Sequence, residues 1–283
     1  MPHPELAAWL GRREVSTDRI VASRVAAWHA TLDHTVEIPG DGDDVPPAIY
    51  WTLFPPLTPT SGLGEDGHAR RGGFLPPVEL PRRMWAGSRL TCHAPLRVGS
   101  VVTRESSIAR IDEKEGRAGP LVFVTVHHVV RVGDDIVLEE EQDLVYRNPS
   151  RPSAAASGSR VTPEVPRAAW ERSINANEVL LFRYSALTFN GHRIHYDRSY
   201  ADCEGYPGLV VHGPLIATLL LDLLHSRRGA ATVERFHFKA MRPSFDGQPL
   251  SLCGAPRDDR SLVDLWSLTA DGDVGVEATA WIR

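Results

Sequence analysis

The pattern of apolar and polar positions predicts three β-strands in the first half of the chain. β-Branched residues recur there in alternating or unbroken apolar runs, which are typical of strands. The runs cover residues 100–111, 121–132 and 135–147. A Gly133-Asp134 pair between the last two indicates a hairpin turn. Within the third run, Glu139-Glu140-Glu141 predicts a solvated strand face.

The second half of the chain repeats this pattern. Its strand-like runs cover residues 234–241, 250–253, 261–269 and 274–283. Pro95–Gly99 precedes the strands of the first half and Pro243–Gly247 those of the second, and both halves end on an arginine. This self-similarity predicts an internal duplication. Each copy is expected to be a helix followed by an antiparallel meander, and two such copies can pair their sheets edge to edge.

Two segments have helical character. Ser16–Leu32 carries apolar residues at helical spacing, with Ser16 or Thr17 as its expected N-cap. Pro214–Leu224 is apolar almost all round, which predicts a buried helix wrapped by a sheet. Pro214 suits its first position, and the amide of Gly213 is free to bind an anion or a developing oxyanion. A simple capped core helix explains the same residues, and both interpretations can hold together.

Composition and charge narrow the class of protein. The 283 residues carry a net charge of −5, so no basic field favours nucleic acid. Three cysteines outside any CxxC motif indicate free thiols in a reducing cytosol. The N-terminus lacks the apolar core of a signal peptide. The most apolar run, 209–224, is shorter than the roughly 20 residues that a membrane span needs. A cytoplasmic protein without membrane contact is expected.

The domain boundary is predicted from a segment of linker composition. Residues 148–161 are rich in Pro, Ser, Ala and Gly and show no apolar periodicity. The expected organisation is an N-terminal domain at 1–149, a linker at 150–165 and a C-terminal domain at 166–283.

A loop at residues 67–87 is unusual because it combines glycines and prolines with large apolar residues. Phe74, Met84 and Trp85 predict that the loop packs down on another part of the protein. Four arginines of this loop could bind a phosphate or could simply be solvated: Arg70, Arg71, Arg82 and Arg83.

The residues best suited to chemistry lie between Asn190 and Asp197. This stretch holds His192 and His195, and histidine exchanges protons near neutral pH. A zinc site using His192, His195, His212 and Asp197 is disfavoured, because no spacing matches an established metal motif. A Ser-His-Asp hydrolase is disfavoured because no GxSxG elbow occurs.

The sequence TFNGHRIHYD followed by GLVVHGPLIATLLLDLL resembles the MaoC-like enoyl-thioester hydratases and dehydratases. In that resemblance His195 matches the catalytic histidine, Asp197 a trailing aspartate, and His212-Gly213 the helix start whose amide polarises the thioester carbonyl. The chain departs from the family where Asn190 replaces its catalytic aspartate and where His192-Arg193 replaces Asn-Pro. With GH-x-x-RG-x-FLPP-x-x-LPRRMWAG, it looks more like the subgroup of 3-hydroxyacyl-thioester dehydratases type 2 and itaconyl-CoA or 3-methylfumaryl-CoA (mesaconyl-CoA) hydratases.

The resemblance implies an α+β fold of two tandem hot-dog domains, each an antiparallel sheet wrapped around a central helix. The C-terminal domain would be catalytic, and the N-terminal one would be non-catalytic and help wall the substrate tunnel. His195 would be the base, and Gly213 would hold the oxyanion. Asn190, which does not titrate near neutrality, would orient the water. Phe74, Trp85 and Arg83 are expected in the tunnel wall.

The expected reaction is reversible hydration of a 2-enoyl-CoA, with a short branched dicarboxylic ester as the leading substrate. His192 and Arg193 would grip its carboxylate or would be structural, and His212 would border the substrate. Alternatives are a dehydratase of 3-hydroxyacyl carrier-protein esters and a non-catalytic acyl-thioester binding module. No metal or other cofactor is implied, and association of two chains as a homodimer is left open.

Overall fold

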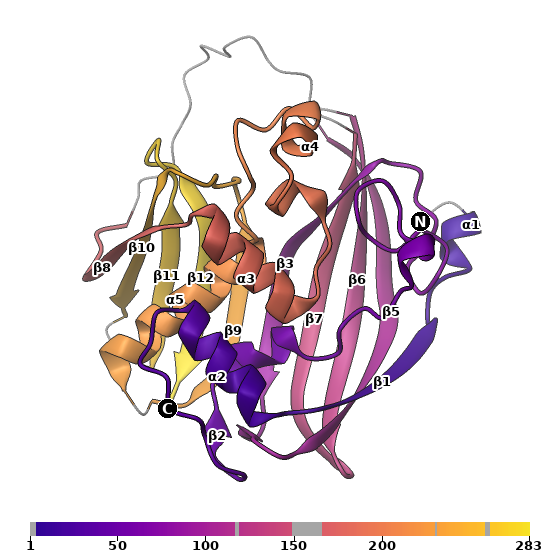
Figure 1. Ribbon diagram of the computed structural model, residues 1–283. Helices are drawn as coiled ribbons and strands as arrows, with labels where there is room; N and C mark the ends of the chain where they lie inside the picture. The colour runs from indigo at the N-terminus through magenta and orange to yellow at the C-terminus, as the bar shows by residue number, and fades with distance from the viewer. Residues whose placement is uncertain (1–3, 117–118, 149–165, 230, 258–260) are drawn as a thin grey trace.

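A single antiparallel sheet of ten strands runs through the molecule (Figure 1). The computed structural model describes residues 4–116, 119–148, 166–229, 231–257 and 261–283. One half of the sheet comes from the N-terminal part of the chain. Its strands, from the outer edge to the centre, are β1 (Arg13–Arg19), β5 (Val101–Gly116), β6 (Gly119–Val132), β7 (Asp135–Arg147) and β3 (Arg82–Cys92).

The other half of the sheet comes from the C-terminal part of the chain. Its strands, from the centre to the opposite edge, are β9 (Val233–Ala240), β12 (Val274–Ile282), β11 (Leu262–Leu268), β10 (Pro249–Pro256) and β8 (Trp170–Asn175). The halves join where β3 pairs with β9, from Gly87 opposite Lys239 to Thr91 opposite Arg235. Gly87 is required at this joint, because a Cβ there would lie 2.4 Å from the carbonyl oxygen of Phe238.

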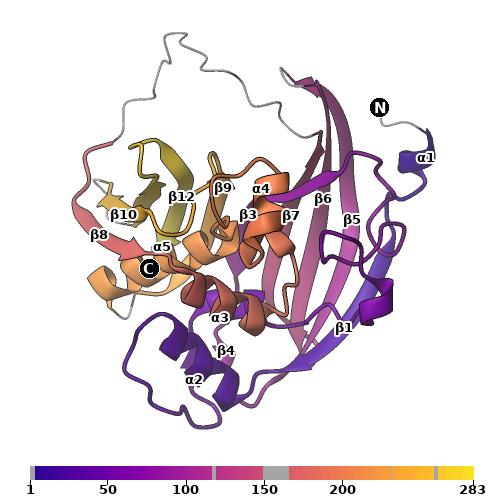
Figure 2. The same ribbon diagram turned by 45° about the horizontal axis from the view of Figure 1, so that its top comes forward.

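The strand order confirms the duplication predicted from the sequence. In each half the first strand lies at the outer edge, the second at the central joint, and the last three fill the space between them. The predicted edge-to-edge pairing of the two sheets is also confirmed. The architecture is the α+β tandem hot-dog that the family resemblance implies, and Figure 2 shows its two halves side by side.

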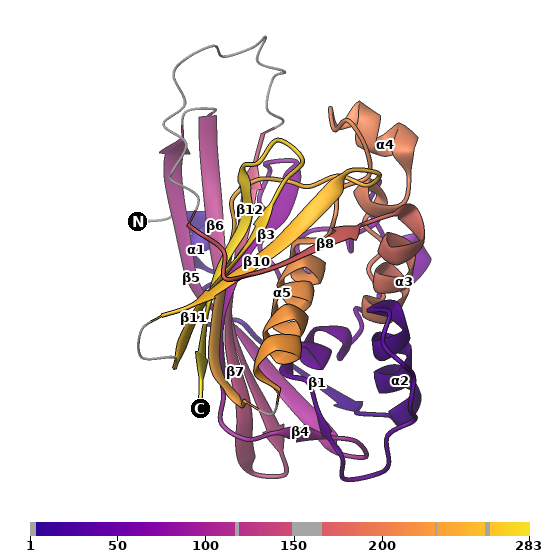
Figure 3. The same ribbon diagram turned by 90° about the vertical axis from the view of Figure 1, so that its left-hand side faces the viewer.

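The helices form two layers on one side of the sheet (Figure 3). Helix α5 (Gly213–Arg228) lies against the sheet, and it is buried from Leu215 to Leu224 because its apolar residues surround the axis. Helices α2 (Ala22–Thr31) and α3 (Glu178–Thr188) pack together in the outer layer. The remaining short elements are α1 (Pro4–Ala7), β2 (Asp44–Val45), η1 (Pro47–Thr52), η2 (Thr60–Gly62), β4 (Leu96–Arg97), η3 (Arg193–His195) and α4 (Arg198–Cys203).

The N-terminal half differs from the expected helix followed by a meander. The predicted helix at Ser16–Leu32 is wrong in its first part, since Ser16 and Thr17 lie in edge strand β1 and pair with β5. Helix α2 begins at Ala22, after an N-cap, Val21, that makes no side-chain hydrogen bond. The polar alternation of Arg13–Arg19 suits an edge strand, whose backbone is paired on one side only. The 3-10 helix η1 lies in the core of this half, and its residues 48–52 are buried.

Glu140 corrects a second expectation. Glu139 and Glu141 point away from the core as predicted for a solvated face, but Glu140 on the same strand is only 2% exposed. Successive side chains of a strand point to opposite faces, so a run of three glutamates necessarily sends one inward. The Glu140 carboxylate accepts a hydrogen bond from Trp51 Nε1 at 3.0 Å.

The glycine-rich loop packs down as predicted, but its predicted extent to residue 87 is wrong, since residues 82–87 lie in strand β3. Val78 is buried and Phe74 and Leu75 are partly buried against a second apolar core, on β5, β6 and β7 of the N-terminal half. The predicted linker at 150–165 lies outside the described residues. Among the helices that the structure describes, none has both the length and the apolar character needed to cross a membrane.

Candidate active site

A cavity of about 1470 Å³ lies between the two halves, and both contribute side chains to it. The C-terminal half supplies the segment around His195 and the start of helix α5 at His212 and Gly213. The N-terminal half supplies η1, the glycine-rich loop and the inner face of β5, β6 and β7. The cavity therefore opens where the duplicated halves meet.

The end of helix α3 places the polar cluster. The helix stops at Phe189, which adopts the left-handed conformation with φ of 51°. The amide of Asn190 then donates to the carbonyl of Ser185 at 2.9 Å, which closes the helix C-terminus. The short helix η3 follows and ends on His195. A helix stop and one turn of 3-10 helix thus bring His195 to the wall of the cavity.

His195 is held as a neutral base. Its side chain is 7% exposed, and Nδ1 donates to the carbonyl oxygen of Val210 at 2.7 Å. A carbonyl oxygen can only accept, so the proton is on Nδ1 and Nε2 keeps its lone pair. Burial lowers the pKa of His195 to about 4. The residue is therefore ready to accept a proton at neutral pH.

His212 and Gly213 form the other wall of the site. The ring of His212 stacks on that of His195 with centroids 3.6 Å apart, and its Nε2 lies 2.9 Å from Ser185 Oγ. Burial and the neighbouring His195 lower the pKa of His212 well below its ordinary value, so it is uncharged. His212 is the N-cap of α5, and Gly213 begins the helix. The Gly213 amide belongs to the first turn, whose amides lack partners within the helix.

Three further residues of the polar cluster differ in whether they reach the cavity: Asn190, Arg193 and Asp197. The Asn190 side chain lines the cavity, and its Oδ1 accepts from the His192 amide at 3.0 Å. Arg193 does not line the cavity. Its guanidinium contacts Asp197 Oδ2 at 2.7 Å and the Glu65 carbonyl at 3.1 Å. Asp197 also caps α4. Arg193 therefore forms a structural salt bridge with Asp197 and does not bind a substrate carboxylate in this structure.

The expected wall residues of the N-terminal half border the cavity: Phe74, Arg83 and Trp85. Of the other loop arginines, Arg71 donates to the carbonyls of Val78 and Pro81, and Arg82 forms an ion pair with Glu204 at 2.6 Å. Arg70, Arg71 and Arg83 line the cavity, whereas Arg82 does not. Only part of the predicted cationic loop therefore faces the substrate space.

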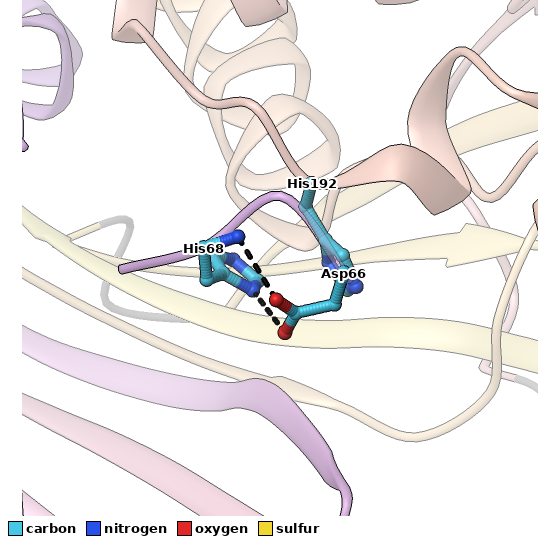
Figure 4. A group of neighbouring side chains, drawn as sticks. All are labelled: Asp66, His68 and His192. Atoms are coloured by element: carbon cyan, nitrogen blue, oxygen red, sulfur yellow. Dashed lines mark hydrogen bonds and ion pairs between the residues drawn. The ribbon is translucent and has the colours of Figure 1, made fainter. Parts of the chain in front are cut away.

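Asp66 and His68 were not singled out from the sequence, although His68 belongs to the GH-x-x-RG segment. His68 Nδ1 lies 3.0 Å from Asp66 Oδ2, and the His68 amide donates to Asp66 Oδ1 at 3.0 Å (Figure 4). Burial would raise the pKa of Asp66, but the bonds from His68 outweigh it and lower that pKa below its usual range. Asp66 is thus an ionised acceptor that holds the proton of His68 on Nδ1.

The ring of His68 packs against histidine rings of the C-terminal half. Its ring lies 4.2 Å from that of His192, which in turn meets His195 edge-on at 5.4 Å. Burial lowers the pKa of His68, and the positive charge of Arg83 adds to that effect. Burial lowers the pKa of His192 to about 2, with His68 and His195 contributing. The row of histidines is consequently neutral.

Metal ligation was considered for this cluster. Among the described residues, Asp66, His68 and His192 are the three-residue group whose ligand atoms lie within 4.8 Å of one another. The group fits a hydrogen-bonded pair better than a ligand set, because His68 Nδ1 donates to Asp66 Oδ2 and the His192 ring packs beside that of His68 at a tilt. The zinc set weighed from the sequence does not assemble, since Asp197 is bound to Arg193. We assign no metal to either group.

Comparison with known families decides which site this is. The family model of the hydroxyacyl-thioester dehydratases type 2 matches residues 49–246, which include the loop at Asp66, the cluster at His195 and the whole of α5. The chain belongs to this family. It is an enzyme, a hydro-lyase that works as a hydratase or dehydratase, and the alternative of a non-catalytic binding module is set aside.

Two relatives agree with the family assignment. The mesaconyl-C(4)-CoA hydratase of Chloroflexus aurantiacus is 44% identical over 280 residues, which cover 99% of this chain and 98% of that protein. The mitochondrial hydroxyacyl-thioester dehydratase type 2 of Schizosaccharomyces pombe is 29% identical over 233 residues, which cover 73% of this chain and 76% of the relative.

Solved structures share the fold. The HtdX protein of Mycobacterium tuberculosis superposes with a TM-score of 0.66 at 21% identity, covering 94% of this chain and 99% of that one. A MaoC-like dehydratase from Phytophthora capsici gives 0.71 at 13% identity, covering 96% and 95%. A further M. tuberculosis protein described as a double hot-dog gives 0.55 at 15% identity, covering 97% and 96%.

Proposed function

We propose that this enzyme adds water reversibly to a 2-enoyl-CoA ester, with a short branched dicarboxylic ester as its substrate. The leading candidate is 3-methylfumaryl-CoA, and itaconyl-CoA is a second member of the same class. The observation that carries the reaction type is the free Nε2 of buried, neutral His195 in the cavity wall that also contains Gly213. The 44% identical relative named for mesaconyl-C(4)-CoA supports the substrate class.

The chemistry follows from the geometry of these groups. Nε2 of His195 takes a proton from water as the water oxygen bonds to the β-carbon. The π electrons move onto the α-carbon and the thioester oxygen, where the Gly213 amide donates to the developing negative charge. Such a donor contributes roughly 3 kcal/mol to a transition state of this kind. The proton on His195 then passes to the α-carbon, which completes the addition and restores the neutral imidazole.

The division of labour between the halves is part of the proposal. Residues 166–283 would form the catalytic domain and residues 1–149 a non-catalytic domain that walls the cavity, with 150–165 as the connection. Phe74, Trp85 and Arg83 support this, because they border the cavity from the N-terminal half. His192 and His212 border it from the C-terminal half, close to His195.

The test is a matched pair of thioesters. In 3-methylcrotonyl-CoA a methyl group replaces the free carboxylate of 3-methylfumaryl-CoA, and the two are otherwise alike. Loss of the enoyl-thioester absorbance should be at least tenfold faster, as kcat/KM, for the dicarboxylic ester, and His195→Ala should abolish it. Equal rates for the pair would remove the dicarboxylic class. If none of these esters nor crotonyl-CoA is hydrated, the proposed function is wrong.

A second candidate is dehydration of 3-hydroxyacyl carrier-protein esters. The relative from S. pombe, named as a hydroxyacyl-thioester dehydratase, supports the dehydration direction and is compatible with either carrier. The same acyl group should be presented on CoA and on an acyl carrier protein. A kcat/KM tenfold higher on the carrier protein would support this second candidate, whereas a preference for CoA supports the first.

A further inference from the structure

The catalytic segment of the C-terminal half is locked to a loop of the N-terminal half. The Arg193 amide donates to the Asp66 carbonyl at 2.9 Å, and the Arg193 guanidinium reaches the Glu65 carbonyl. Gly67 and Gly191 touch backbone to backbone: a Cβ on Gly67, whose φ is +87°, would lie 1.9 Å from the Gly191 oxygen. Only glycine permits such an approach. This contact fixes the position of the Asp66-His68 pair relative to His195.

Water attacking the substrate has two hydrogens that require acceptors. His195 Nε2 can accept one of them. Asn190 lines the cavity, and its Oδ1 accepts the His192 amide, so that oxygen has one remaining lone pair to offer a water. His192 and His212 are packed between neighbouring rings. Beside His195, these described side chains of the C-terminal half therefore offer a second acceptor only from atoms that are already hydrogen-bonded or packed against rings.

His68 has the properties of that acceptor. It lines the cavity, and its side chain is 21% exposed, so solvent or substrate can reach it. Asp66 accepts the proton of Nδ1 and thereby fixes the tautomer in which Nε2 carries a lone pair. A carboxylate behind an imidazole also makes that imidazole a better acceptor.

We propose that His68, held by Asp66, is a second catalytic residue of the hydration, so that the N-terminal half supplies one catalytic group in addition to part of the cavity wall. Its Nε2 accepts the hydrogen of the attacking water that stays on the product hydroxyl, while His195 takes the other hydrogen and returns it to the α-carbon. No proton is gained or lost by His68 over the cycle. Asp66 is a positioning residue that acts through His68. The inference rests on the proposed hydratase activity.

The test combines the loss of His68 with a replacement acceptor. His68→Ala should lower kcat about 100-fold with little change in KM, because a group that acts on the reacting water is removed. Asn190→Asp places a carboxylate oxygen at a cavity-lining position. Adding it to His68→Ala should restore kcat at least tenfold, whereas a merely structural role for His68 predicts no rescue.

Two further variants keep the test decisive. Asp66→Asn retains the size of the side chain but loses its charge, so the tautomer of His68 is no longer fixed, and kcat should fall at least tenfold. His93→Ala is the matched control, because this histidine pairs with Glu139 outside the cavity. It should leave kcat and KM unchanged.

Three outcomes would overturn the assignment. Unchanged kcat in His68→Ala or in Asp66→Asn would do so, as would a His68→Ala enzyme that folds and binds CoA esters but is not rescued by Asn190→Asp. Loss of wild-type activity on dialysis against a chelator, with recovery on adding a divalent metal, would replace the dyad by a metal site. A wild type that hydrates no enoyl thioester would instead refute the proposed function itself.

Discussion

The two halves share one strand order, yet their inner sheet faces differ in how many polar side chains they carry. In the C-terminal half the face is apolar, with Leu252, Val263 and Ala280 fully buried, and the 16-residue helix α5 covers it. In the N-terminal half the six-residue η1 is the counterpart of α5, and the face is mixed, because polar side chains lie on it beside the buried Val102, Val126 and Leu138. Its buried or half-buried polar side chains are Ser88, Arg104, Ser106, His128, Glu140 and Gln142.

The difference shows how a duplicated fold can separate stability from substrate binding. A continuous apolar helix on an apolar face is stabilised by the loss of water from both surfaces. A face with hydrogen-bonded polar groups tolerates a water-filled cavity beside it, because those groups remain satisfied. Arg104, His128, Glu140 and Gln142 indeed line the cavity.

The largest effect is expected at His195. His195→Ala should lower kcat about 1000-fold, equivalent to about 4 kcal/mol, because the general base is lost. The matched change is His128→Ala, which removes a buried histidine that contacts Ser106 Oγ at 2.8 Å in the N-terminal half. It should change kcat by less than threefold and lower the free energy of unfolding by roughly 1–3 kcal/mol. Steady-state kinetics and urea unfolding separate the two. A 1000-fold loss in His128→Ala would show that the inner sheet face of the N-terminal half also performs chemistry.

The second prediction concerns Asp222, through which α5 contacts both halves. This side chain is 3% exposed and pairs with Arg172 Nη2 at 2.7 Å and with His34 Nε2 at 2.8 Å. Asp222→Ala should lower the free energy of unfolding by roughly 3 kcal/mol, because it leaves the partly buried Arg172 without its carboxylate partner. Glu139→Ala, at a half-exposed pair with His93, should cost less than about 1 kcal/mol. Equal losses in urea unfolding would contradict the view that α5 organises the core.

The third prediction is the acid limb of the activity profile. Because burial lowers the pKa of His195 to about 4, kcat/KM should stay level from pH 8 to about pH 5 and fall only below that. A histidine with a pKa of 6.5 would already have lost roughly 30-fold at pH 5. The free energy of unfolding should also fall with falling pH. The contribution of neutral His195 to it is complete above pH 6.5 and is lost as the pH falls toward 4. An acid limb centred near 6.5 would place the base in a more solvated position.

The smallest effect is expected at Glu140. Burial raises the pKa of this carboxyl, against the opposing hydrogen bonds from Ser88, Trp51 and Tyr50. Its contribution to stability is therefore complete below about pH 4.5 and is lost as pH rises through the folded-state pKa. Glu140→Gln should match the wild type at pH 4.5 and exceed it by roughly 1 kcal/mol at pH 8 in urea unfolding. Glu141→Gln, on the solvated face, should show no such trend. A destabilised Glu140→Gln at both pH values would mean that the charge itself is required.

The sequence predicted those elements whose apolar pattern directly reflects their burial in the fold. The β-branched runs became β5, β6 and β7, and Pro214–Leu224 became the core of α5, because alternation and all-round apolarity report burial directly. His195, Asn190 and Gly213 were found through their motif and do border one cavity. Ser16 and Thr17 were misread because helical spacing in a short polar stretch cannot be told from edge-strand alternation.

What the sequence determined by itself is the duplicated pattern of strands, the buried helix and the histidine-bearing segment that follows α3. The tertiary structure alone decided which charged residues face the cavity. Arg193 turned to Asp197, Glu140 turned inward, and the Asp66-His68 pair arrived from the other half at a glycine contact 124 residues along the chain, between Gly67 and Gly191. Those placements depend on contacts between segments far apart in sequence, whose geometry exists only once the two sheets have joined.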